Sequence, residues 1–195
     1  MAASSVISFS RHNPARQAAA LAYRRVVEHS RHPLFFTHCG VPDTLDGRFE
    51  LICLHAFFYL HRLRAERPRG EDVGQYFVDE MFADMDRSLR EIGTGDLSVG
   101  REVKRMAQAF YGRVKAYEQG LAEGDALLTA VLARNLYGTV PQPAPSLASM
   151  AAYTRREAAQ LRRRPADGLL AGRVCFGPPI APVAQAARQA AGETS

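Results

Sequence analysis

Residues 77–117 read FVDEMFADMDRSLREIGTGDLSVGREVKRMAQAFYGRVKAY, and this stretch decides the fold class. On both sides of Gly93 and Gly95, apolar side chains recur every three or four residues, which is the spacing of the buried face of an α-helix. The glycines between the two runs are typical of a turn. The stretch therefore predicts two long helices, at about residues 71–92 and 99–121.

Other helical segments flank these two. Residues 44–66 predict a helix that is apolar on all sides between Leu51 and Leu60, and such a helix is expected to be central and buried. Further helices are expected at about 14–31, 125–136 and 146–164, with a short turn of helix at 34–39. We expect an all-α, single-domain, bundle-like array of about six helices.

The two ends of the chain are expected to lie outside this array. Proline-rich residues 141–145 predict a linker, and Gly, Pro and small residues dominate the end of the chain. The expected organisation is a disordered start at 1–13, a helical domain at 14–140, a linker with a basic helix at 141–164, and an extended or disordered tail at 165–195.

The net charge of +5 is unevenly distributed. Residues 1–150 hold 18 basic and 17 acidic side chains, whereas residues 151–195 hold 7 and 3. Arg155, Arg156 and the run at 162–164 can contact anionic lipid or ribosomal RNA, or form a solvated basic helix face. No aromatic residues interleave with the run at 162–164 to stack on bases. Arg outnumbers Lys 23 to 2, which we interpret as the codon bias of a GC-rich genome.

The sequence lacks the motifs that identify several classes of functional site. There is no Walker loop, GxGxxG, GxSxG or HExxH motif, so the sequence predicts no enzyme and no cofactor. The three cysteines form no CxxC pair, which favours a reducing compartment. The longest apolar run, residues 51–60, is far shorter than the ~20 residues of a membrane span.

One histidine interrupts the apolar run of the central helix. His55 shares a stripe with Arg48 and Arg62, which lie seven residues away on either side. We expect this stripe to meet solvent or acidic neighbours. A haem or metal ligand is the alternative, but no second histidine lies one turn away.

Charged residues also mark the two helices of the opening stretch. Asp84 falls at the edge of the apolar face, so we expect a buried structural ion pair with Arg48 or Arg113. The alternative is catalysis by an aspartate. Lys104 and Lys115 share one stripe with Tyr111 beside them, which is either a contact surface or a solvated face.

Two stretches carry a resemblance to a known family. Residues 40–55, GVPDTLDGRFELICLH, and residues 77–117 resemble the ubiquinol–cytochrome c chaperone family of bacteria and mitochondria, with a weaker match at 132–138. The resemblance covers about residues 20–138. It implies a soluble α-helical chaperone that binds newly made cytochrome b and supports assembly of the ubiquinol–cytochrome c reductase (bc1) complex.

The resemblance has further implications for location and partners. Mitochondrial members also work with a small partner subunit and near the ribosomal exit tunnel. This chain lacks their long N-terminal extension, which implies a bacterial version in the cytoplasm or at the cytoplasmic face of the inner membrane. No DNA partner is expected.

Matched positions with an unusual physical setting are the candidate partner-binding residues. They are Asp43, Asp46, Arg48, Asp79, Asp84, Asp86, Arg87, Arg90, Lys104, Tyr111 and Arg113. Two other functions remain open: an adaptor on the ribosome, RNA or a membrane surface, and a small helical enzyme that uses Asp79, Asp84 or Asp86 with His55.

Overall fold

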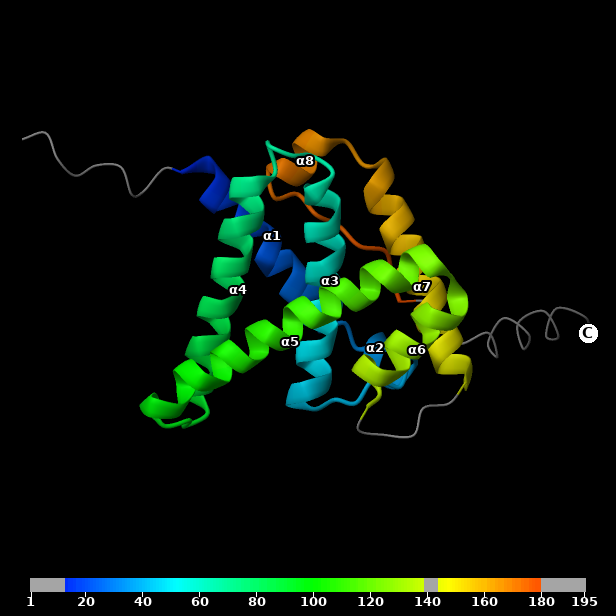
Figure 1. Ribbon diagram of the computed structural model, residues 1–195, viewed down its shortest axis with the longest axis horizontal. Helices are drawn as coiled ribbons and strands as arrows, with labels where there is room; N and C mark the ends of the chain where they lie inside the picture. The colour runs from blue at the N-terminus through cyan, green and yellow to red at the C-terminus, as the bar shows by residue number, and fades with distance from the viewer. Residues whose placement is uncertain (1–12, 139–143, 180–195) are drawn as a thin grey trace, which may run out of the picture.

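The structure, a computed structural model, describes residues 13–138 and 144–179. Within these ranges it contains eight α-helices and no strand, so the predicted all-α class is confirmed (Figure 1). The helices are α1 (Pro14–Ser30), α2 (Leu34–Thr37), α3 (Leu45–Arg64), α4 (Glu71–Glu91), α5 (Asp96–Glu123), α6 (Asp125–Leu136), α7 (Ala144–Arg163) and α8 (Ala166–Leu170).

Helix α3 is the centre of the array. It contacts α1, α4, α5, α6, α7 and α8, and its residues 53–59 are all buried. A helix surrounded by others has no face for polar side chains, which explains its apolar run. The predicted central position of this segment is therefore confirmed.

Local signals set where the first and third helices begin. The side chain of Asn13 accepts hydrogen bonds from the backbone N–H groups of Ala15 and Arg16, at 3.0 and 3.4 Å, and Pro14 fills the first turn of α1. Thr44 Oγ1 accepts from the N–H of Gly47 at 3.1 Å and caps α3. These caps satisfy backbone donors that have no partner within the helix.

Helices α4 and α5 cover two sides of α3. Helix α1 lies along α4, where the rings of Tyr23 and Phe77 meet edge to face at 5.7 Å (Figure 1). Helix α5 crosses α3 obliquely and is longer than predicted, because it begins at Asp96. A single residue, Gly124, joins α5 to α6 with a φ of 118°, a conformation that favours glycine.

The C-terminal part differs from its prediction. Helix α7 packs against α3 and α6 and buries Tyr153, so it belongs to the array. Residues 166–170, expected to be extended or disordered, form α8. The hydroxyl of Tyr59 donates to the carbonyl of Leu169 at 2.8 Å. Residues 171 and 172 form a turn, residues 173–179 have no regular secondary structure, and Val174 is buried in the core.

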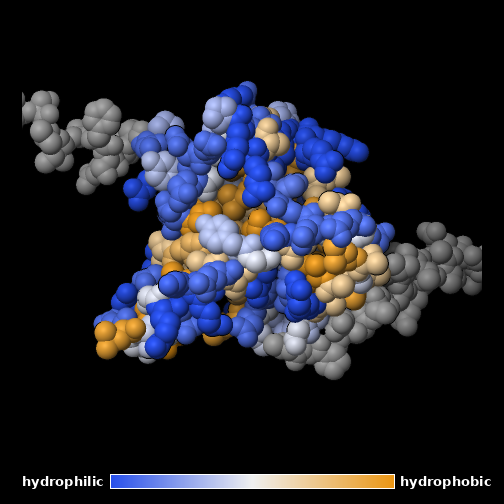
Figure 2. Space-filling view, in the orientation of Figure 1, coloured by the Kyte–Doolittle hydropathy of each residue, from blue (hydrophilic) through white to orange (hydrophobic). Residues whose placement is uncertain are grey.

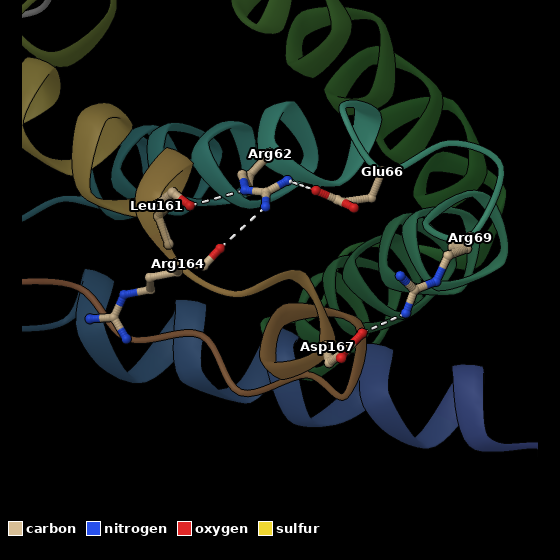
Figure 3. A network of polar contacts seen from close by, with 6 residues as sticks. All are labelled: Arg62, Glu66, Arg69, Leu161, Arg164 and Asp167. Carbon is tan, nitrogen blue, oxygen red and sulfur yellow. Dashed lines mark hydrogen bonds and ion pairs between the residues drawn. The ribbon is translucent and has the colours of Figure 1, made fainter.

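A single arginine of α3 holds the end of α7. Arg62 Nε donates to the carbonyl of Leu161 at 3.0 Å, and Arg62 Nη2 donates to the carbonyl of Arg164 at 3.2 Å (Figure 3). Its remaining nitrogen pairs with Glu66. A cation is favourable here because the last carbonyls of a helix lack their usual partner within the helix. The carbonyl of Leu161 also accepts from the backbone N–H of Arg164 at 3.2 Å. After α7 the chain continues into α8, where Arg69 binds Asp167 at 2.5 Å.

Most of the predicted disordered start at residues 1–13, part of the linker and residues 180–195 lie outside the described residues. None of the helices in the described part of the chain is both long and apolar enough to cross a membrane.

Candidate functional site

The outer side of α5 carries an exposed stripe that mixes apolar and basic residues. Leu97, Lys104 and Tyr111 follow each other at intervals of seven residues, two helical turns, and therefore share this stripe. The side chain of Leu97 is 99% exposed and that of Tyr111 is 56% exposed. We call this stripe the α5 ridge; it comprises Leu97, Gly100, Lys104, Gln108, Tyr111, Gly112 and Lys115, all of them exposed.

Two glycines leave the backbone of this ridge open. A Cβ atom placed on Gly100 or on Gly112 would have no neighbouring atom within 4 Å. Glycine inside an exposed helix costs about 1 kcal/mol relative to alanine, and no packing contact within the described residues requires it here. A glycine at such a place lets another backbone approach the helix closely.

A groove runs along each side of the α5 ridge. One has a volume of about 420 Å³ and lies between α3, α4 and α5, with Leu60, Val78 and Phe110 among its lining residues. Figure 2 shows apolar residues in the hollow at the centre of this face, bordered by hydrophilic ones. The other groove, of about 480 Å³, lies between the start of α3, α5 and the end of α6. The ridge and its grooves together form an uneven surface.

A buried ion pair forms one wall of the second groove. Glu50, which is only 6% exposed, binds the guanidinium of Arg113, and that guanidinium also lies 5.6 Å from the ring centre of Phe49. Burial raises the pKa of Glu50, while the hydrogen bond and charge of Arg113 oppose that rise. Asp46 lines the same groove. The pair fixes α5 on α3 and places Arg113 at the surface of the groove.

Asp84 has different partners from those predicted. The hydroxyl of Tyr23 donates to Asp84 Oδ2 at 2.8 Å, and Arg87 pairs with its other oxygen. The expected pairing with Arg48 or Arg113 is wrong, because α1, and not α3 or α5, covers this side of α4. Burial is the main reason why the pKa of Tyr23 is raised, and the contact with Asp84 adds to the rise. Asp84 therefore joins α1 to α4.

The other candidate residues lie in separate places. Asp43 pairs with Arg48 at 2.7 Å beside a depression that Arg31 and Phe36 also line. On α4, Asp79 accepts a hydrogen bond from Gln75. Arg90 binds Asp86 at 2.7 Å and Asp96 at 2.6 Å near the α4–α5 turn.

The eleven candidates therefore do not form one surface. Lys104 and Tyr111 lie on the α5 ridge, and Asp46 and Arg113 line the groove beside it. The three candidate aspartates of α4, Asp79, Asp84 and Asp86, each bind a different partner. They do not converge with buried His55, so the described residues do not bring together the set considered for a small helical enzyme.

His55 contradicts its prediction most clearly. It is fully buried, and its Nε2 atom lies 2.7 Å from the hydroxyl of Tyr153 on α7. Burial lowers the pKa of His55 to about 3, so the ring is neutral. The stripe that it shares with Arg48 and Arg62 was expected to meet solvent or acidic neighbours, which holds for Arg62 beside Glu66 but not for His55. In the structure α7 covers that part of the stripe, and Arg48 stays exposed.

Two residues of the α5 ridge and the groove beside it, Leu97 and Glu50, were not predicted. Leu97 is a leucine in the first turn of α5 on the side opposite its buried face, and the interval of seven to Lys104 and Tyr111 was a signal that could have found it. Glu50 directly precedes the apolar run of α3, inside the matched stretch 40–55. A carboxylate at the start of a buried helix indicates a partner from another element.

Comparisons with known proteins agree on one relationship. The chain is 28% identical over 169 residues to the ubiquinol-cytochrome-c reductase complex assembly factor 1 of Xenopus laevis, covering 86% of this chain and 84% of that protein. It is 26% identical to the mouse protein of the same description over 83% of this chain, and spans 55% of that relative's length. The crystal structure of the Cbp3 homolog from Brucella abortus superposes with a TM-score of 0.74 and 36% identity, covering 84% of this chain and 91% of that one.

A family profile covers most of the described helices. The profile, described as Ubiquinol-cytochrome C chaperone, matches residues 37–176, from the end of α2 to the segment that follows α8. This range includes the α5 ridge and both grooves beside it. The chain therefore belongs to the ubiquinol–cytochrome c chaperone family.

Proposed function

We propose that this protein is an assembly chaperone that binds newly made cytochrome b and supports assembly of the ubiquinol–cytochrome c reductase complex. The α5 ridge and the groove lined by Asp46 and Arg113 would be its docking surface. The family membership and the descriptions of its relatives support a role in assembling this complex.

The exposure of two large side chains supports the α5 ridge as the docking surface. Leu97 and Tyr111 are exposed on a helix whose other side is packed into the core. Tyr111 also lines the groove that contains Leu60, Val78 and Phe110, so its ring continues an apolar surface. An exposed apolar patch bordered by polar residues such as Lys104 indicates an interaction site. Tyr111 suits the role of an anchor, because tyrosine offers a large contact area and loses little conformational freedom on binding.

The mechanism that follows is one of holding. Cytochrome b is a membrane protein whose polar loops meet water, and a rigid helical ridge can bind such loops before the other subunits arrive. The lysines would attract acidic loop residues and select the orientation of binding. The ion pair of Glu50 with Arg113 keeps α5 fixed on α3, so that little conformational freedom is lost on docking.

The proposal is tested by crosslinking in cells that make cytochrome b. A photoreactive amino acid is placed at position 97 or 111, and at the exposed position Gln160 on α7 as a control. We expect crosslinks to newly made cytochrome b from positions 97 and 111 and none from position 160. Equal crosslinking from all three positions would reject this docking surface.

A second measurement tests the function itself. Tyr111→Ala combined with Lys104→Glu should reduce the cytochrome b that co-purifies with the tagged protein, whereas Arg16→Glu, a charge reversal at an exposed site on α1, should not. Failure of the wild type to co-purify cytochrome b, together with normal levels of the complex in a deletion strain, would overturn the proposed function.

A further inference from the structure

A groove between α1 and the segment after α8 gathers arginines from distant parts of the chain. It has a volume of about 600 Å³. Arg25 comes from α1, Arg164 follows the end of α7, and Arg173 belongs to the C-terminal segment. We call this the arginine groove; its apolar lining is Leu21, Val174 and Phe176.

The positive charge of this groove is mostly unneutralised. Among the described residues, Glu28 is the only acidic one that lines it, and it pairs with Arg25 at 2.9 Å. Arg62 binds only the backbone carbonyl of Arg164. Figure 3 shows that the guanidinium of Arg164 is turned away from Arg62. Within residues 13–138 and 144–179, the guanidinium groups of Arg164 and Arg173 have no ion-pair partner. Arg162 and Arg163 are exposed directly before Arg164.

Like charges brought together by a fold create a local positive potential that attracts an anion. Arginine suits a phosphate in particular, because its planar guanidinium can donate two parallel hydrogen bonds to phosphate oxygens. Free phosphate or a nucleic acid backbone would make no use of the apolar lining. A phospholipid offers a phosphate and an apolar chain that is joined to it.

We propose that the arginine groove binds an anionic phospholipid, with the phosphate at Arg164 and Arg173 and an acyl chain along the half-buried Leu21 and Phe176. This site would hold the protein against an anionic membrane surface. It uses residues remote in sequence from the α5 ridge and does not depend on the proposed client.

RNA fits the groove less well. Binding to single-stranded RNA relies on aromatic faces on which bases stack. The ring of Phe176 is packed within the protein, 5.1 Å from the ring centre of His29 and 5.0 Å from that of His55. The other rings that line the groove, those of His29 and His32, are also half-buried, so no fully exposed ring is offered to a base. An acyl chain needs only the half-buried edges of Leu21 and Phe176.

Flotation of the full chain with vesicles tests the proposal. The protein is mixed with vesicles of phosphatidylcholine alone or of phosphatidylcholine with phosphatidylglycerol, with Arg164→Glu combined with Arg173→Glu as the test variant. Arg101→Glu combined with Arg134→Glu is the matched control, because these exposed arginines lie on α5 and α6. Circular dichroism checks that both variants fold.

We expect the wild type and the control to float only with the vesicles that contain phosphatidylglycerol. The test variant should bind these vesicles about tenfold more weakly or worse, since each arginine near an anionic surface is worth about 1 kcal/mol. Soluble dihexanoyl phosphatidylglycerol should compete with the vesicles, and inorganic phosphate at the same concentration should not.

Three results would overturn the proposal. One is flotation of the wild type that does not depend on phosphatidylglycerol, and another is equal binding by the test variant and the control. The third is tighter binding of the wild type to single-stranded RNA than to the vesicles, with the same arginines required, which would assign the groove to a nucleic acid.

Discussion

The Nε2 atom of His55 and the hydroxyl of Tyr153 lie 2.7 Å apart inside the core, and they join α3 to α7 across 98 residues of sequence. The protonation of each group follows from its neighbours. The Nδ1 atom of His55 lies 2.7 Å from the carbonyl of Leu51, and a carbonyl can only accept, so Nδ1 carries the proton. Nε2 must then accept from Tyr153, whose oxygen in turn accepts from His29 Nε2 at 2.9 Å.

Removing the Tyr153 hydroxyl, which links His55 to His29, should destabilise the fold. In Tyr153→Phe, the buried Nε2 of His55 loses its only donor and His29 loses its acceptor. We expect the free energy of unfolding to fall by about 1–3 kcal/mol, the cost of buried polar atoms left without partners. Urea denaturation followed by circular dichroism measures it. Tyr111→Phe removes an exposed hydroxyl and should change stability by less than about 0.5 kcal/mol; equal losses in both variants would contradict the role of this contact.

The same two histidines predict how stability depends on pH. Burial lowers the pKa of His55 to about 3 and that of His29 to about 4, whereas both return to about 6.5 in the unfolded chain. Between these values the unfolded state binds more protons, so stability is complete above pH 6.5 and falls as the pH drops toward 4. The slope should approach roughly 1.4 kcal/mol per pH unit for each histidine.

Denaturation curves recorded between pH 7.5 and pH 4 in steps of about half a unit test this dependence. His29→Gln should reduce the slope, because one of the two groups no longer titrates. His38→Gln serves as the control, because the described contact of His38, at the C-terminal end of α2, is with the neighbouring hydroxyl of Thr37. An unchanged slope in His29→Gln would show that other groups cause the dependence.

Arg62 should matter more for stability than its neighbour on the same helix. Arg62→Ala leaves two carbonyls at the end of α7 without their charged donor, and we expect a loss of about 2–3 kcal/mol. Arg64 forms an exposed ion pair with Glu118, and Arg64→Ala should cost less than about 1 kcal/mol. Thermal unfolding compares the two, and similar midpoints would rule out the capping role of Arg62.

Gly112, one of the two open glycines of the α5 ridge, offers a test in which stability and client binding change in opposite directions. Gly112→Ala adds a methyl group where no atom lies within 4 Å, so it should stabilise the free protein by about 1 kcal/mol. If a client backbone approaches the ridge closely at this point, the same change should weaken cytochrome b capture. A more stable variant that captures the client as well as the wild type would exclude such an approach.

A second glycine should show the reverse effect on stability. Gly172 has a φ of 77°, and a Cβ atom on it would lie 2.1 Å from the carbonyl oxygen of Ala18 on α1. Gly172→Ala must therefore displace the C-terminal segment from α1, and we expect a loss of about 2 kcal/mol or more. Urea denaturation measures the loss, and a variant as stable as the wild type would show that the segment packs less closely than the structure indicates.

Much of the secondary structure could be predicted from local features. The stripe from Val73 to Met85 and the apolar run of α3 follow from spacing along the chain, and Thr44 caps α3 as its position indicates. These features involve residues within a turn or two of each other, so no knowledge of the other helices is needed. The two matched stretches were likewise sufficient to identify the family.

The partners of the buried polar groups could not be predicted in this way. Arg113 binds Glu50 instead of Asp84, and His55 meets Tyr153 instead of solvent, because these pairs depend on which helices pack together. A helical periodicity indicates which side of a helix is buried, but it leaves open which helix covers that side. The proposed docking surface depends on the same information: Tyr111 is exposed because no other helix in the described chain packs over the outer side of α5.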